Sequence, residues 1–96
     1  MEFEWNPNKN RTNLIKHRIA FEDALDVFAD PYELTEPAKT VGGELREQTI
    51  GFVEQLAILL VVHTKRERMD GTEVTRIMSA RPASRKERQR YERRKS

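Results

Sequence analysis

The 96-residue sequence predicts a single α+β domain, with two N-terminal helices, an antiparallel sheet of about four strands and a basic C-terminal helix. Three observations predict this fold class. Apolar residues recur with a helical period over residues 21–28, whereas over 46–81 they form strand-like runs broken by turn residues. The polar segment 84–96 opens with a helix-start motif. Helices followed by a run of strands are typical of an α+β domain, and this length suits one domain rather than two.

The first third of the chain contains the two expected helices. Phe3 and Trp5 alternate with glutamates, which predicts a short strand before them. An Asn-Pro pair then predicts a helix over residues 6–17, because Asn caps helices well and Pro is favoured in the first turn. Apolar residues spaced i, i+3, i+4 and i+7 predict the second helix over 21–28, which Asp30-Pro31 ends.

The middle of the chain predicts the sheet. The expected strands are 32–35, limited by prolines as at a sheet edge, then 46–53, 56–64 and 73–81. The run 56–64 is almost wholly apolar, as in a central strand. A glycine pair predicts a loop over 39–44, and Asp70-Gly71 predicts a hairpin turn within 65–72.

The last helix has an unusual composition. Ser84 and Glu87 have the spacing of a capping box, which predicts a helix from residue 85. From there to the end of the chain the only apolar residue is Tyr91, so burial alone cannot hold this helix on a core. We expect a partner protein or an RNA backbone to hold it, or else the helix to fray in isolation. Tyr91 itself either anchors the helix to the sheet or acts on RNA.

Charge is distributed unevenly along the chain. Residues 1–64 carry six Lys/Arg and eleven Asp/Glu, whereas residues 65–96 carry twelve and five. This asymmetry indicates either a surface that attracts a polyanion or a solvated basic tail. The absence of cysteine excludes disulfides and thiolate metal sites. No secretory signal is recognisable and the longest apolar run, 56–62, is too short to cross a bilayer, so we expect a cytoplasmic protein without membrane contact.

The chemistry-bearing residues do not suit metal, nucleotide or serine-hydrolase chemistry. His17 and His63 are far apart in sequence, and neither lies in a metal-binding motif. The glycine pair is not followed by a phosphate-loop lysine, and no nucleophile elbow is present. We therefore expect no metal and no cofactor. RNA carries its own nucleophile, so its cleavage needs only a base, an acid and fixed cations.

Titratable and cationic residues near the strand ends and on the last helix are the candidates for that chemistry. The hairpin's symmetry places His63 nearer to Arg76 than to Arg81, although the register is not readable from sequence. Guanidinium groups suit phosphate because their donors form a planar fork. Glu44 and Arg46 are either a carboxylate base with a cation or an exposed pair. The catalytic candidates are His63, Arg76, Arg81, Glu44 and Tyr91, and the RNA-binding candidates are Arg46, Arg85, Lys86, Arg88, Lys16 and His17.

Several ordered motifs resemble one known family. They are Phe3-Glu4-Trp5-Asn6-Pro7-x-Lys9, Asn13-x-x-Lys16-His17, Phe21-Glu22-Asp23-Ala24-x-x-Val27-Phe28-x-Asp30-Pro31, Glu44-x-Arg46, Leu60-Val61-Val62-His63-Thr64, Arg76-Ile77-Met78-Ser79-Ala80-Arg81 and Ala83-Ser84-Arg85-Lys86-Glu87-Arg88-x-x-Tyr91-Glu92. In this order they resemble the BrnT toxins over nearly the whole chain. Arg18 departs from the pattern, because the family often has Gly there, and Pro82 stands where a basic residue is common.

The resemblance implies a RelE-like fold and a ribonuclease toxin of a type II toxin–antitoxin system that blocks translation. It also implies a cognate antitoxin that represses the shared operon together with the toxin, and we expect the two proteins to form a hetero-tetramer. Our hypothesis is metal-independent cleavage by attack of the 2′-hydroxyl, giving a 2′,3′-cyclic phosphate and a 5′-hydroxyl. Arg76 and Arg81 would stabilise the phosphorane, and His63 or Glu44 would accept the proton. The alternatives are a non-catalytic RNA- or ribosome-binding module and a pure protein-interaction subunit.

Overall fold

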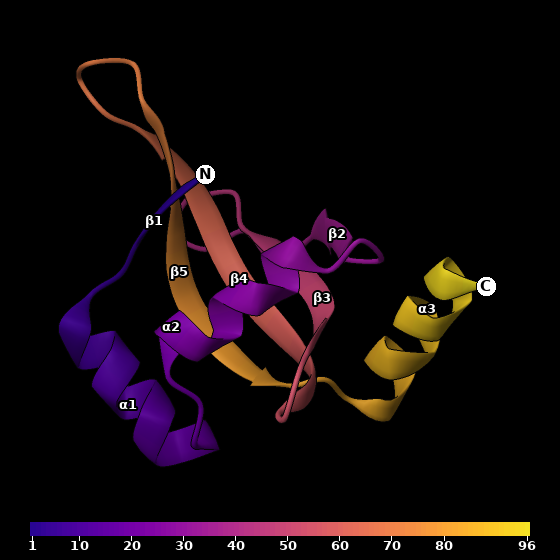
Figure 1. The fold of residues 1–96 in the computed structure, drawn as a ribbon. Helices are drawn as coiled ribbons and strands as arrows, with labels where there is room; N and C mark the ends of the chain where they lie inside the picture. Colours follow the sequence, from indigo (N-terminus) through magenta and orange to yellow (C-terminus); the bar gives the residue numbers. More distant parts are fainter.

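A five-stranded sheet with strand order β1-β5-β4-β3-β2 organises the molecule, and the computed structural model describes all residues 1–96 (Figure 1). The elements in chain order are β1 (Glu2–Glu4), α1 (Pro7–His17), α2 (Phe21–Ala24), η1 (Leu25–Ala29, a 3-10 helix), β2 (Leu34–Pro37), β3 (Glu47–Val53), β4 (Ala57–Glu67), β5 (Glu73–Pro82) and α3 (Arg85–Lys95). The predicted α+β class is confirmed. None of the helices is both long and apolar enough to cross a membrane.

The sheet differs from the expected one in having a fifth, parallel strand. The pairs β2–β3, β3–β4 and β4–β5 are antiparallel, but β1 runs parallel to β5, with Phe3 opposite Thr75. The prediction of an antiparallel sheet of about four strands was therefore wrong in this respect. β1 is held there because the Phe3 ring packs on the Phe28 ring of η1, with centroids 5.1 Å apart.

The helix α1 takes the place of a neighbouring strand along the rest of the β5 edge. The Asn13 side chain is buried, and its amide donates to the carbonyl of Ala80 at 2.8 Å while accepting from the Ala80 N–H at 3.1 Å. The edge groups of β5 are thereby satisfied without a strand. α1 ends at Arg18, which adopts the left-handed conformation with φ 60°. This left-handed conformation favours glycine, so it accounts for the position at which Arg18 departs from the pattern of the family that the sequence resembles.

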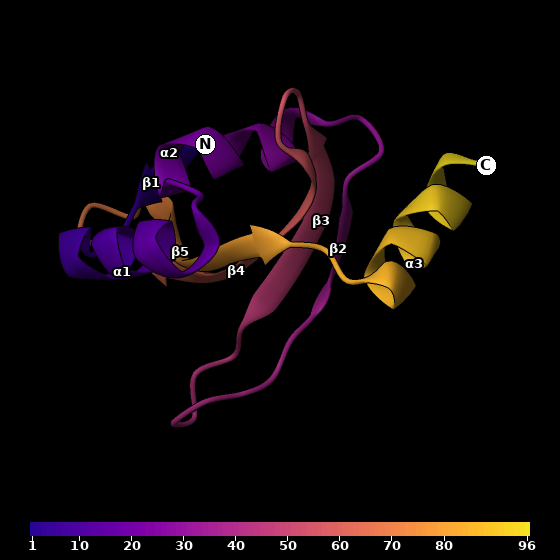
Figure 2. The ribbon, with the colours of Figure 1, turned by 90° about the horizontal axis from the view of Figure 1, so that it is seen from below.

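The second helix is shorter than predicted, because it tightens into η1 at Leu25. Together α2 and η1 cross one face of the sheet (Figures 1 and 2). Gly51 permits the close approach of η1 to β3, since a Cβ atom there would lie 2.8 Å from the carbonyl oxygen of Val27. The main core fills this layer with Ile19, Phe21, Ala24, Val27, Val53, Leu59, Val61, Ile77 and Ala80.

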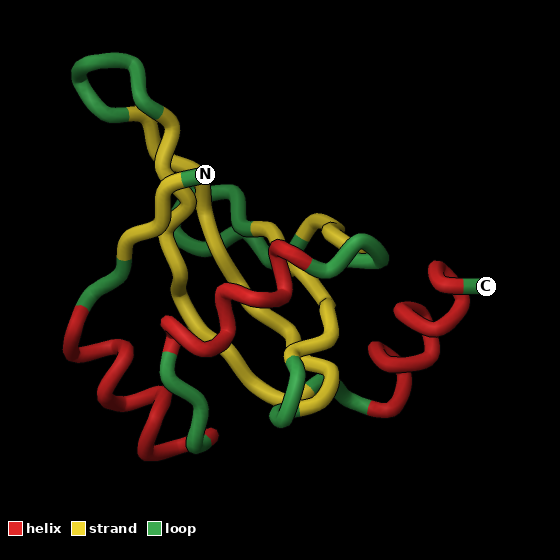
Figure 3. Tube along the Cα trace, in the orientation of Figure 1, coloured by secondary structure: helices red, strands yellow, loops and turns green.

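The β4–β5 hairpin is longer than predicted and projects beyond the body of the molecule (Figure 1). Its turn is confined to residues 68–72, where the Arg68 N–H donates to the carbonyl of Thr72 at 2.8 Å. The green loop at the hairpin tip in Figure 3 marks this turn. The expected turn over 65–72 was thus too long, because residues 65–67 still belong to β4 and the pairing continues to Glu67 opposite Glu73.

The helix α3 lies on the other side of β3 and β2 from α2 (Figure 2). The predicted capping box is confirmed, with Ser84 and Glu87 bonded in both directions. Tyr91 is buried against Ile50 and Leu60, and α3 also makes polar contacts to β2 and to the segment before it. The expectation that an RNA or a partner must hold this helix was wrong, because contacts within the chain hold it.

Candidate nucleic-acid interface

The sheet face opposite α2 and η1, here called the open face, is only partly covered by α3. The helix packs over Ile50 and Leu60. Further along β4, the register sets Val62 beside Gln48 and Ser79 in one row, and Thr64 beside Arg76 in the next. These two rows, which lie beyond the cluster under α3, carry polar and cationic side chains from three strands.

A β-bulge at Met78 brings two of the candidate arginines to this open face. Arg76 and Arg81 are five residues apart, so a regular strand would point them to opposite faces. In the observed register Arg76 pairs with Thr64 and Arg81 pairs with Leu60, which share a face of β4. Val62 pairs with Ser79 and the next residue, His63, pairs with Ile77, so Met78 is an extra residue that resets the alternation along β5. The bulge therefore makes a two-arginine surface possible on β5.

The side chain of Arg76 is held by Glu4 of the neighbouring strand β1. Its Nη1 atom donates to Glu4 Oε2 at 2.7 Å, and Arg66 donates to the same oxygen at 3.2 Å. The hydrogen bond from Arg76 is the main reason that the pKa of Glu4 is lowered. Two guanidinium groups thus share one carboxylate, which leaves surplus positive charge on a fixed arginine.

Arg81 is engaged by the first turn of α3. It forms a bidentate ion pair with Glu87, in which Nη1 donates to Oε1 at 2.7 Å and Nη2 donates to Oε2 at 2.9 Å. The hydrogen bond from Arg81 is the main cause that lowers the pKa of Glu87 to about 2, and the same bond raises the pKa of Arg81. In this state Arg81 ties α3 to the end of β5, and its charge is largely balanced.

Arg46 and Glu44 lie at the margin of the open face. Continuing the β3–β4 register by one residue beyond the pair Glu47–His63 sets Arg46 opposite Thr64, which separates it from Arg76 on the other side of β4. Its Nε atom is buried without a hydrogen-bond partner and lies 3.9 Å from a carboxylate oxygen of Glu44. The exposed Glu44 lines a shallow hollow with Lys65. Glu44 is therefore within reach of solvent and of an anion bound near Arg46.

The structure encloses His63 between the sheet and η1. Only 3% of the residue is exposed, and its ring meets the Phe28 ring edge-on at 5.1 Å. Its Nε2 atom is hydrogen-bonded to Thr49 Oγ1 at 2.8 Å, and Thr49 is bonded in turn to Thr35. Burial lowers the pKa of His63, which favours a neutral ring. The register confirms that Arg76 is closer to His63 than Arg81 is, but the two side chains point to opposite faces.

Tyr91 is enclosed as well. Its hydroxyl donates to the Asp30 carboxylate, which also accepts from the backbone N–H groups of Tyr32 and Phe52, each at 2.8 Å. Burial, followed by the hydrogen bond to Asp30, raises the pKa of Tyr91. The geometry is that of an anchor for α3.

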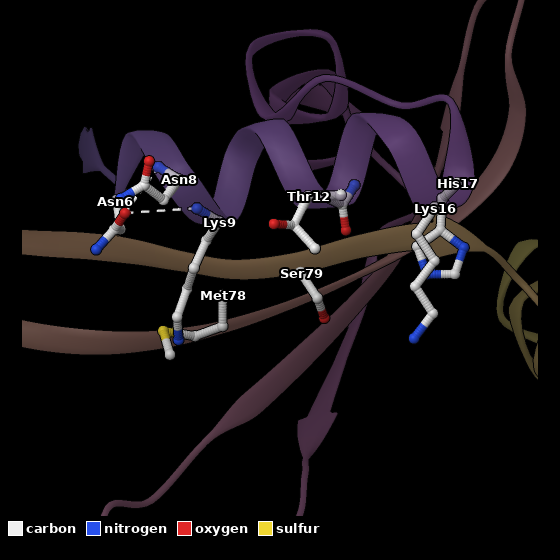
Figure 4. A pocket seen from close by; sticks show the side chains of 9 residues that line it. Asn6, Asn8, Lys9, Thr12, Lys16, His17, Met78 and Ser79 are labelled. Atoms are coloured by element: carbon white, nitrogen blue, oxygen red, sulfur yellow. Dashed lines mark hydrogen bonds between the residues drawn. The ribbon is translucent and has the colours of Figure 1, made fainter.

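A basic groove lies between α1 and the bulged part of β5 (Figure 4). It has a volume of about 390 Å³, and α1 contributes Lys9, Thr12, Lys16 and His17 to it while β5 contributes Ser79. Lys16 and His17 were expected to meet RNA, whereas Lys9, Thr12 and Ser79, which line the same groove, were not among the candidates. The spacing 9, 12, 16 on a helix was the signal that could have found the two on α1.

The remaining RNA-binding candidates lie on the exposed side of α3. Arg85, Lys86 and Arg88 are all exposed. Arg88 and Ile58 line the same hollow. Ile58 is six residues from Thr64 along β4, a distance of about 20 Å at roughly 3.3 Å per strand residue, and Thr64 is the residue opposite Arg76. Arg85 and Arg88, which line hollows with Ile58, are therefore not gathered with Arg76 into one site.

Arginines on an open sheet face, together with a lysine- and histidine-lined groove, define a small α+β protein whose surface suits a phosphate backbone. The comparisons with known proteins make the class more specific. The family described as "Ribonuclease toxin, BrnT, of type II toxin-antitoxin system" matches residues 5–87, and the chain belongs to this family. The resemblance of the motifs is thereby confirmed.

A solved structure supports the same relationship. The crystal structure of the Brucella abortus ribonuclease toxin BrnT is similar to this chain with a TM-score of 0.63 and 27% sequence identity. The similarity covers 88% of this chain and 99% of the Brucella chain. Among curated proteins no match was found. The α+β fold with its basic face is thus the fold of a BrnT toxin.

Proposed function

We propose that this chain is an endoribonuclease that cleaves RNA without a metal ion on its open sheet face and thereby stops translation. The observation that carries the proposal is the bulge at Met78, which sets Arg76 and Arg81 on one face beside Ser79. No three His, Cys, Asp or Glu side chains gather at one point as metal ligands would. In this proposal the charge at phosphorus is therefore stabilised by guanidinium groups.

The proposed reaction uses the nucleophile of the RNA itself. Backbone phosphates lie along the α1 groove, contacting Lys9, Lys16 and His17, and one phosphodiester reaches Arg76. The 2′-oxygen bonds to phosphorus while the bond to the 5′-oxygen breaks, giving a 2′,3′-cyclic phosphate and a 5′-hydroxyl. The 2′-hydroxyl proton passes to a carboxylate or imidazole, and a proton from solvent or an acid reaches the leaving oxygen.

The structure favours some of the expected roles over others. Arg76 and Arg46 stabilise the phosphorane in this proposal, and Arg81 contributes once its pair with Glu87 opens. Glu44 is exposed and beside Arg46, so it suits the proton acceptor better than the enclosed His63. We assign His63 the role of holding β3 through Thr49, and Tyr91 the role of holding α3.

The test is cleavage of a labelled single-stranded RNA in excess EDTA. We expect the wild type to cleave and Arg76→Ala to be slower by about 100-fold or more, as when one transition-state donor is removed. Arg68→Ala is the matched control, because Arg68 lies on the same hairpin and is also paired with an N-terminal glutamate, Glu2. Cleavage that requires added metal, or equal cleavage by Arg76→Ala and the wild type, would refute the proposal.

The second candidate function is RNA or ribosome binding without chemistry, and the basic α1 groove is the observation that favours it. It predicts salt-dependent binding of RNA that stays intact. Translation arrest on induced expression, with intact messenger and ribosomal RNA on a gel, would support this candidate over cleavage.

The proposal includes a protein partner. Membership of a toxin–antitoxin family implies a cognate antitoxin. We propose that the antitoxin neutralises this chain in the cytoplasm, that the complex is a hetero-tetramer, and that the complex represses the operon. Size-exclusion chromatography with light scattering on the co-expressed pair measures the stoichiometry directly.

A further inference from the structure

A second groove, at the opposite end of the sheet from Arg76, takes no part in the proposed cleavage. It lies between α3, the segment that joins η1 to β2, and the β3–β4 turn, with a volume of about 560 Å³. Its walls include Tyr32, Phe52 and Ile58, and Arg88 and Lys95 lie at its rim. We call it the α3 groove.

Large apolar side chains are exposed in the α3 groove. Phe52 is 52% exposed and Tyr32 is 46% exposed. The register explains the first, because Gly51 must face η1 and so Phe52 points to the face that α3 covers. Tyr91 is the only apolar side chain that α3 offers, and it covers Ile50 rather than Phe52. Exposed rings that line one groove in a small protein indicate a surface for docking.

The chemistry of the groove favours a protein segment over an RNA base. The Asp30 carboxylate within it already accepts three hydrogen bonds, from Tyr91, Tyr32 and Phe52. A bound base would need hydrogen-bond partners for its edge, whereas an apolar side chain needs only carbon contacts. The walls of Phe52 and Ile58 supply those contacts.

Positive charge outweighs negative charge around the α3 groove once the adjoining hollow is included. Arg88 and Lys95 take part in none of the ion pairs, and an adjoining hollow of about 450 Å³ adds Arg85 and Arg93. Against these four cations the two hollows have two acidic side chains, Asp30 and Glu92. Lys95 also acts electrostatically on Asp30 and lies over the Tyr32 ring, 5.8 Å from its centroid. The complementary partner therefore combines apolar side chains with carboxylates, as an acidic amphipathic segment does.

We infer that the α3 groove docks an acidic amphipathic segment of the cognate antitoxin, whose apolar side chains cover Phe52 and Tyr32 and whose carboxylates pair with Arg88 and Lys95. The inference rests on the proposed function only in taking the antitoxin as the partner. It leaves the α1 groove and Arg76 uncovered, so docking here is separable from RNA cleavage.

The experiment titrates the antitoxin encoded beside this chain's gene into the purified chain by calorimetry. Phe52→Ser and Lys95→Gln change the groove, and Ile15→Ser and Lys39→Gln are the matched controls on exposed residues elsewhere. We expect Phe52→Ser to raise Kd by about tenfold or more, as loss of an interface aromatic does, and Lys95→Gln to weaken binding less and reduce its salt dependence. The controls keep Kd within about twofold, and thermal unfolding verifies that every variant is folded.

The possible outcomes separate this inference from the proposed function. A wild type that does not bind the antitoxin, or a folded Phe52→Ser variant with unchanged Kd, would overturn the inference. A Phe52→Ser variant that binds the antitoxin normally but no longer cleaves RNA would assign the groove to RNA and also overturn it. Loss of antitoxin binding on Phe52→Ser supports the inference even if the wild type cleaves no RNA, in which case only the proposed function fails.

Discussion

Tyr91 donates a hydrogen bond to the carboxylate of Asp30, a residue 61 positions earlier in the chain. The same carboxylate accepts from the backbone of Tyr32 and Phe52. Burial raises the pKa of Asp30, but the hydrogen bonds, of which that from Tyr91 is the largest, hold it below its usual value. One carboxylate thus joins the end of η1, the strand β3 and the helix α3.

Tyr91→Phe tests this junction. The variant keeps the ring that packs on Ile50 but removes one donor to a charged acceptor, so we expect it to lose about 1.5–3 kcal/mol of stability. Urea unfolding followed by circular dichroism measures the loss. Tyr32→Phe is the control, because the Tyr32 ring is exposed and only its backbone meets Asp30. Equal midpoints for Tyr91→Phe and the wild type would show that the bond contributes nothing to stability.

Asn13→Asp tests the junction between α1 and β5. The Asn13 amide donates to the carbonyls of Ile19 and Ala80, and a carboxylate at that place would face both oxygens. The folded state then raises the pKa of the new carboxyl above its unfolded value of about 3.9, so the loss of stability grows as pH rises. We expect a loss of about 2–4 kcal/mol at pH 7 that narrows towards pH 4.

The control for that variant is Asn10→Asp. The Asn10 side chain only accepts a hydrogen bond, from the Phe21 N–H at 2.9 Å, which a carboxylate can also accept. Its stability should stay close to that of the wild type at neutral pH. If Asn13→Asp and Asn10→Asp lost the same free energy of unfolding at pH 7, the direction of the Asn13 hydrogen bonds would not be the cause of the loss.

Gly51→Ala tests the contact between β3 and η1. The added Cβ would lie 2.8–2.9 Å from the Val27 carbonyl oxygen, Cα and Cβ, and the backbone there cannot rotate away. We expect a loss of about 1–3 kcal/mol in urea unfolding. Gly71→Ala has free space but a φ of +85°, so it should cost only backbone strain, about 1 kcal/mol. A Gly51 variant as stable as the wild type would mean that η1 can move away from β3.

Local sequence predicted the elements whose determinants are local. The Asn6-Pro7 start and the Ser84–Glu87 capping box each lie within one turn, and the structure contains both. The same reasoning failed for the α2 helix beyond Leu25, where the chain tightens to let η1 pack on β3. It predicted β1 as a short strand but not its place in the sheet, because the choice of β5 as a parallel partner depends on residues about 70 positions away.

The candidate site was harder to predict, because the face of the sheet on which a side chain lies and the register between strands both depend on tertiary structure. The sequence singled out Arg76, Arg81, Lys16 and His17 as candidates, but not the bulge that sets the two arginines on one face. No glycine or proline marks Met78 as a bulge. The burial of His63 could not be predicted either, since the sequence pattern of an apolar strand that ends in histidine is the same whichever face of the sheet the histidine side chain lies on. Only the helix that covers it decides.

Deletion of Met78 tests the bulge. Removing one residue restores regular alternation, so either Arg76 or Arg81 would have to turn towards the core layer. A buried unpaired charge costs about 3–5 kcal/mol, and we expect the deletion variant to be largely unfolded by circular dichroism. Met78→Ala keeps the chain length and should fold and cleave RNA. A folded, active deletion variant would contradict the role given to the bulge.

The ion pair between Arg81 and Glu87 predicts the acid limb of the stability profile. The pKa of Glu87 lies at about 2 instead of 4.5 because Arg81 bonds to it in the folded state. A lowered folded pKa means that the contribution is complete above about pH 4.5 and is lost as pH falls towards 2. Since Arg81 is partly exposed and solvent screens the pair, we expect the contribution to be about 1–2 kcal/mol.

Glu4, Glu36 and Asp30 also have lowered pKa values and add to the same acid limb of the stability profile, so Glu87→Gln should flatten the profile rather than remove its slope. Urea midpoints between pH 2 and 7 measure it, with the exposed Glu54→Gln as control. If Glu87→Gln kept the full slope between pH 4.5 and 2, the pair would hold α3 no more firmly than solvent does, and α3 would be free to release Arg81 to the RNA.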